Sequence, residues 1–238
     1  MTHRALARQY AAVAAACSAL SLAGTATAAD AAHPAVVELF QSQGCSSCPP
    51  ANANVIALSG RPDILALSFQ VTYWDQLGWK DTFAQPQFTA RQWDYAHAFN
   101  HGEVWTPQVV INGRADVIGV RKGEIEAQVA RSDRGSSGPA LAIAGGRVAI
   151  AGTAPRGRPA DVWLVRYDPN IVQVPIRRGE NGGRTLPHKN VVKSLVRLGA
   201  WSGGARTYPL PTAAGDGLKS AVLVQQGPGG VILAAARA

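Results

Sequence analysis

Two cysteines three positions apart, Cys45 and Cys48, stand between an apolar run and a pair of prolines. The run at residues 35–40 is short and rich in β-branched side chains, which predicts a buried strand. Proline is tolerated in the first turn of a helix, so a helix is expected over Pro49–Leu58. The sequence therefore predicts a strand, a tight loop that carries both thiols, and a helix, in that order.

This spacing allows the two thiols to meet across one turn as a reversible disulfide. A helix N-terminus favours a thiolate, so Cys45 is expected to attack and Cys48 to resolve. Two alternatives stay open: a static disulfide that pins the turn, and a metal bound by both thiols. A zinc site needs about four ligands, and no second cysteine pair exists, so neither a metal nor a cofactor is predicted.

Glu38 is a carboxylate inside the apolar strand, seven residues before Cys45. Burial raises the pKa of a carboxylate and would suit it to accept a proton from the resolving thiol. We therefore count Glu38 with the cysteines as a candidate catalytic residue. The alternative is a glutamate at an exposed edge that only interrupts the run.

Two further segments could contact a substrate. Thr106 and Pro107 precede an apolar run. Beside a Cys-x-x-Cys pair, thioredoxin-like folds carry a cis-proline at this place, so a cis peptide bond is expected here; an ordinary proline at the start of a strand is the alternative. The backbone beside it could pair with a partner chain. Trp74 and Trp79 belong to an aromatic loop that could form a lip over the thiols. These four residues are the candidate substrate-binding residues, although the tryptophans could equally cover the edge of the core.

The pattern along residues 31–133 is strand, helix, strand, helix, hairpin and helix, with Asn112-Gly113 as the hairpin turn. This order matches an α/β, thioredoxin-like domain. Residues 134–139 have the composition of a linker. Residues 140–238 contain short strand patterns, which predict a smaller, sandwich-like β-rich domain.

The first 29 residues are typical of a secretory signal peptide, with two arginines, an apolar stretch and a run of small residues. Its removal would take Cys17 and two basic charges away, lowering the net charge from +8 to +6. The product is expected in the periplasm or secreted, without a membrane span. The basic residues are scattered and follow no nucleic-acid-binding motif, so no nucleic-acid partner is predicted.

Several motifs resemble those of an exported, thioredoxin-like bacterial family catalogued only as a domain of unknown function. They are the stretch 37–50, Tyr73-Trp74-Asp75, Gly78-Trp79-Lys80-Asp81, residues 88–92, residues 106–113, Gly179-Glu180-Asn181, Gly183-Arg184, Leu186 and residues 188–192. The resemblance implies a fold and export, and it implies no established reaction.

The function predicted from the sequence is thiol–disulfide exchange with protein or small-molecule thiols and disulfides. A non-catalytic binding module with a structural disulfide, and a copper or zinc carrier, are the alternatives. The sequence gives no prediction of oligomeric state, of the redox partner or of the direction of electron flow.

Overall fold

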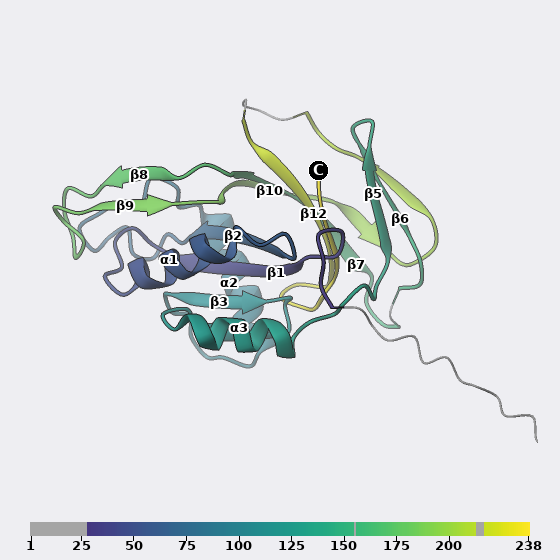
Figure 1. The fold of residues 1–238 in the computed structure, drawn as a ribbon, viewed down its shortest axis with the longest axis horizontal. Helices are drawn as coiled ribbons and strands as arrows, with labels where there is room; N and C mark the ends of the chain where they lie inside the picture. The colour runs from purple at the N-terminus through teal and green to yellow at the C-terminus, as the bar shows by residue number, and fades with distance from the viewer. Residues whose placement is uncertain (1–27, 155, 213–216) are drawn as a thin grey trace, which may run out of the picture.

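The computed structural model describes residues 28–154, 156–212 and 217–238 (Figure 1). The predicted signal peptide and Cys17 lie outside these residues, apart from the last two positions of the peptide. The helices are α1 (Cys48–Leu58), α2 (Pro86–Ala98) and α3 (Lys122–Arg131). The strands are β1 (Ala35–Gln41), β2 (Ile64–Gln70), β3 (Gln108–Ile111), β4 (Ala115–Ile118), β5 (Ala140–Ala144), β6 (Arg147–Ala151), β7 (Ala160–Asp168), β8 (Val172–Pro175), β9 (Thr185–His188), β10 (Val191–Trp201), β11 (Arg206–Pro209), β12 (Lys219–Gln226) and β13 (Ile232–Arg237).

One mixed sheet of eight strands organises the described residues, in the order β13-β12-β7-β10-β2-β1-β3-β4. Strand β2 pairs in parallel with β1 and with β10, whereas the other neighbours in this sheet are antiparallel. A three-stranded sheet (β11-β6-β5) and a two-stranded one (β8-β9) complete the structure. The chain is therefore mostly β-sheet.

The predicted fold class, an α/β thioredoxin-like domain followed by a smaller sandwich-like domain, is wrong. The described helices are short, with 11, 13 and 10 residues, and strands from both halves of the chain share the eight-stranded sheet. Strand β10 lies beside β2, so the sheet continues across the predicted linker at 134–139. Whether the two halves fold independently stays a prediction.

The strand predicted at residues 35–40 and the helix predicted over Pro49–Leu58 are present as β1 and α1, with ends within one residue of those expected. All seven residues of β1 and of β2 are buried, as expected of central strands covered on both faces. Asn112 and Gly113 both have positive φ, 50° and 59°, which is the conformation that a tight hairpin turn requires. The predicted turn is thus confirmed.

The side chains of β1 alternate between the two faces of the sheet. Val37 and Leu39 pack with α1 and α3 on one face, and Val36 and Phe40 pack with α2 on the other. Figure 1 shows α1 and α3 in front of the sheet and α2 behind it. Glu38 has the parity of Val36 and Phe40, and it therefore faces α2.

A third apolar cluster fills the space between the β7-β10-β12-β13 part of the large sheet and the three-stranded sheet. Trp201 is its largest fully buried side chain. The predicted β-rich half thus packs its strands around a core of its own while also extending the large sheet. Among the described residues, no helix has the length and apolar character needed to cross a membrane.

Candidate functional site: a disulfide at the start of α1

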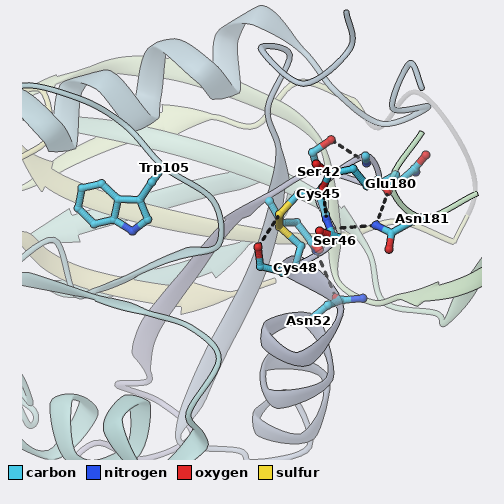
Figure 2. Close-up of a disulfide and its surroundings, with 12 residues drawn as sticks. Ser42, Cys45, Ser46, Cys48, Asn52, Trp105, Glu180 and Asn181 are labelled. Atoms are coloured by element: carbon cyan, nitrogen blue, oxygen red, sulfur yellow. Dashed lines mark hydrogen bonds between the residues drawn. A yellow bond between two sulfur atoms is a disulfide. The ribbon is translucent and has the colours of Figure 1, made fainter. Parts of the chain in front are cut away.

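Cys45 lies in the loop after β1, and Cys48 is the first residue of α1. The two form a disulfide, with their Cα atoms 5.4 Å apart (Figure 2). Both residues are buried, with exposed fractions of 0% for Cys45 and 1% for Cys48. The predicted pairing is confirmed, and the bond lies beneath the surface.

The start of α1 offers few free N–H groups to a sulfur. The Cys48 N–H donates to the carbonyl of Cys45 at 3.2 Å, and Pro49 and Pro50 have no N–H. The Ser47 hydroxyl oxygen lies 4.0 Å from Cys45 Sγ, at the outer limit of contact with a sulfur. The helix dipole still favours a thiolate here, but few N–H groups are left to donate hydrogen bonds to it.

The turn between β8 and β9 holds the cysteine loop from the other half of the chain. The side-chain amide of Asn181 donates to the carbonyls of Gln43 and Cys45, each at 2.9 Å, and Asn181 is fully buried. The carboxylate of Glu180 accepts the Ser46 N–H at 3.0 Å. Figure 2 shows Glu180 and Asn181 on one side of the disulfide and Trp105 on the other.

Asp81 fixes the same loop from the segment before α2. Its carboxylate accepts the N–H groups of Gln43, at 2.7 Å, and of Phe83, at 2.8 Å. Burial raises the pKa of Asp81 to about 6, although these bonds lower it. The indole N–H of Trp79 donates to the Gln43 side chain at 2.9 Å, so Trp79 also positions this loop.

Glu38 is fully buried and forms an ion pair with Arg91 on α2. Arg91 Nε donates to Glu38 Oε1 at 2.7 Å, and Arg91 Nη2 donates to Glu38 Oε2 at 3.1 Å. The Tyr95 hydroxyl also donates to Glu38. Arg91 further donates to Gln225 on β12, at 3.0 Å. The structure therefore places Glu38 on the α2 face of the sheet, opposite the face that α1 covers, and surrounds it with partners. Its predicted catalytic role stays a prediction.

The peptide bond between Thr106 and Pro107 is cis, as predicted. Four buried polar atoms in and near this segment make no hydrogen bond within the described residues. They are Tyr73 Oη, Trp74 Nε1, Trp105 Nε1 and Thr106 Oγ1. The Trp74 side chain lies beside Gly44, next to Cys45. Burial raises the pKa of Tyr73 to about 12, while Gln92 and Thr106 beside it lower it.

A buried polar cluster lies under the first turns of α1. Asn52 accepts from the Gln41 side chain at 3.2 Å, which also donates to Ser68 at 2.6 Å, and Asn52 donates to the carbonyl of Pro187. His188 follows Pro187 in the chain and is buried, and neither of its ring nitrogens has a hydrogen-bond partner among the described residues. Burial lowers the pKa of His188 to about 4, so its ring is neutral at pH 7.

Three roles in this site were missed by the sequence interpretation. Arg91 was not paired with Glu38, and neither Asn181 nor Asp81 was assigned a contact with the cysteine loop. Each of the three residues lies in a motif that the sequence analysis noted without a role: residues 88–92, Gly78-Trp79-Lys80-Asp81 and Gly179-Glu180-Asn181. In the described parts of the chain, no three His, Cys, Asp or Glu side chains gather in a way that could hold a metal ion.

The fold and site define a mixed β-sheet protein with a buried Cys-x-x-Cys disulfide at the start of a helix. Residues 36–225 match the family described as "Protein of unknown function (DUF1223)", and the chain belongs to that family. No functionally curated protein matches the sequence.

Two solved structures resemble the chain. Protein AGR_C_4864 from Agrobacterium tumefaciens is 30% identical, with a TM-score of 0.69 over 87% of this chain and 94% of that one. HBP35 of Porphyromonas gingivalis is 11% identical, with a TM-score of 0.59 over 87% of this chain and 75% of that one. At this low identity, the second likeness concerns the fold alone.

Proposed function

We propose that this protein is an exported thiol–disulfide oxidoreductase that works through Cys45 and Cys48. The observation that carries the proposal is their disulfide, which lies at the start of α1. The dipole of α1 favours a thiolate near its start once the bond is opened. The predicted signal peptide supports a periplasmic or secreted location, where disulfides persist.

The reaction would proceed by two exchanges. A partner thiolate attacks Cys45 Sγ, the Cys45–Cys48 bond breaks, and Cys48 leaves as a thiolate that takes up a proton. A second partner thiolate then attacks the partner sulfur of the mixed disulfide and releases Cys45. Two electrons pass from the partner dithiol to the cysteine pair, and the reverse sequence reduces a partner disulfide.

A partner must reach a buried sulfur, so its binding has to displace or pass the segments around Cys45. Trp74, Thr106 and Pro107, with Trp79 at the rim, form the proposed substrate-binding residues. The indole N–H of Trp74 has no hydrogen-bond partner among the described residues, and it suits a carbonyl oxygen of an extended partner chain.

The test is an insulin-reduction assay in which dithiothreitol regenerates the protein. The wild type is expected to accelerate the reaction, and Cys45→Ser to abolish the acceleration. Cys48→Ser should still attack an insulin disulfide through the Cys45 thiolate, releasing one insulin thiol, and accumulate a mixed disulfide with insulin that mass spectrometry detects. Equal activity of wild type and Cys45→Ser would refute the proposal.

A second function, a binding module in which the disulfide only pins the loop, is favoured by one observation: both cysteines are almost fully buried. Under this alternative, removing the disulfide would lower the stability of the protein, and neither cysteine variant would form a mixed disulfide. The same two variants therefore separate the two functions.

A further inference from the structure

The carboxylate of Glu180 is hydrogen-bonded to the Cys-x-x-Cys segment, and the proposed reaction does not use it. Its Oε2 accepts the N–H of Ser46, the residue directly after Cys45, although the two are 134 positions apart in the chain. The hydrogen bonds from Ser46 lower the pKa of Glu180, so the side chain is ionised at neutral pH. Asn181 anchors the turn next to it on the carbonyls of Gln43 and Cys45.

The N–H of Ser46 matters because other donors near Cys45 are scarce. A thiolate at this kind of site is stabilised by N–H groups of its own segment and of the first helical turn. Here the Cys48 N–H donates to the Cys45 carbonyl, and Pro49 and Pro50 have none. Glu180 thus occupies one of the few backbone donors of the cysteine loop and places a negative charge on the residue that follows Cys45.

We propose that Glu180 is a positioning residue that shifts the Cys45–Cys48 pair toward its disulfide form. In the disulfide the sulfurs are neutral, and the carboxylate is tolerated. Reduction adds two electrons, breaks the S–S bond and places a thiolate or thiol at Cys45. A thiolate there is repelled by Glu180 and lacks the Ser46 N–H, so Glu180 disfavours the reduced state.

This inference deepens the proposed function, because it concerns the redox equilibrium of the same pair. It also assigns a role to the C-terminal half, whose β8-β9 turn carries Glu180. Removal of the charge should favour the reduced protein and lower the pKa of the Cys45 thiol. Because Glu180 is exposed, salt should screen the effect.

The experiment compares wild type with Glu180→Gln, which keeps an oxygen that can accept the Ser46 N–H but removes the charge. Glu126→Gln, on α3, is the matched control, since it removes an exposed carboxylate that contacts Lys122. Each protein is equilibrated with reduced and oxidised dithiothreitol at pH 7 and low salt, and the reduced fraction is measured by alkylation and mass spectrometry.

The equilibrium constant for reduction is expected to rise at least about threefold in Glu180→Gln and to stay unchanged in Glu126→Gln. In 1 M NaCl, where charges are screened within about 3 Å, the difference between wild type and Glu180→Gln should shrink. Equal constants for wild type and Glu180→Gln at low salt would overturn the inference, and so would a difference that salt leaves unchanged.

Glu180→Ala provides a second variant that removes both the charge and the acceptor, and it should shift the constant in the same direction. Thermal unfolding of each variant verifies that the fold is intact. The dithiothreitol equilibrium needs no protein partner. A wild type that fails to reduce insulin would therefore refute the proposed function, while the shift in Glu180→Gln would still decide the inference.

Discussion

Loss of Arg91 should destabilise the protein strongly, because it leaves a buried carboxylate without its cation. Arg91 donates to both oxygens of Glu38 and to Tyr95 and Gln225, and its exposed fraction is 5%. In Arg91→Met, Glu38 would retain only the Tyr95 hydroxyl. Breaking a buried ion pair on one side costs about 3–5 kcal/mol, a large share of the roughly 5–15 kcal/mol that stabilises a domain.

The double variant Glu38→Leu with Arg91→Met should recover most of that loss. Replacing both charges by apolar side chains is often neutral, since it also removes the cost of desolvating them. Urea unfolding followed by tryptophan fluorescence gives the free energy of each variant, and the double-mutant cycle gives the coupling between the two residues. A loss below about 1 kcal/mol in Arg91→Met, or additive losses in the double variant, would refute this account of the pair. Insulin reduction by folded Glu38→Gln tests the predicted catalytic role separately.

Three further predictions concern the surroundings of the disulfide. Asn181→Ala removes a donor from two buried carbonyls and should lower the free energy of unfolding in urea by about 1–3 kcal/mol. The loss should be smaller in the control Asn54→Ala, because the Asn54 amide also donates to two carbonyls but is only half-buried. The pKa of Asp81 is about 6 in the folded protein, above its unfolded value, so its contribution to stability falls as pH rises from about 4 to 6. The pKa of His188 is about 4 in the folded protein, below its unfolded value, so its contribution to stability is lost as pH falls from about 6.5 to 4. The free energy of unfolding of the wild type should therefore be nearly constant between pH 4 and 6. It should rise with pH in Asp81→Asn and fall with pH in His188→Phe. Parallel pH profiles for all three proteins would contradict these assignments. Trp74→Phe removes an indole N–H that has no hydrogen-bond partner among the described residues. It should leave the melting temperature nearly unchanged while slowing exchange with a peptide disulfide; an unchanged exchange rate would exclude the Trp74 indole from partner binding.

Local sequence signals predicted the neighbourhood of the cysteines well. The apolar run, the two prolines and the turn at Asn112-Gly113 each act through a few adjacent residues, and the structure has the strand, helix and hairpin that they predict. The disulfide was likewise predictable, because the spacing of the cysteines lets them meet across one turn, whereas the cis bond at Pro107 was expected from its place in thioredoxin-like folds.

The sheet topology was not predictable in this way. The large sheet continues past β2 through β10, and one residue pair, Val191 with Ser68, records their parallel contact. Alternation of apolar residues shows that a strand has a buried face, but it does not show which distant strand lies beside it. The C-terminal strands were therefore assigned to a separate sandwich, although four of them, β7, β10, β12 and β13, extend the same sheet.

Glu38 shows the corresponding limit for the site. A glutamate in a buried strand was recognised as unusual, but the sequence does not show that Arg91 lies 2.7 Å away on another element. The same holds for Asn181, which is 136 positions from Cys45. Contacts of this kind depend on how the elements pack, and they decide whether a buried polar residue is paired or free to react.

The most direct test of the proposed function is the reduction potential of the Cys45–Cys48 pair in the wild-type protein, measured against glutathione or dithiothreitol. Structural disulfides in exported proteins typically lie below about −300 mV. We predict a value above that limit, together with loss of insulin reduction in Cys45→Ser. A potential well below about −300 mV would contradict exchange and identify the disulfide as a fixed bridge of the loop.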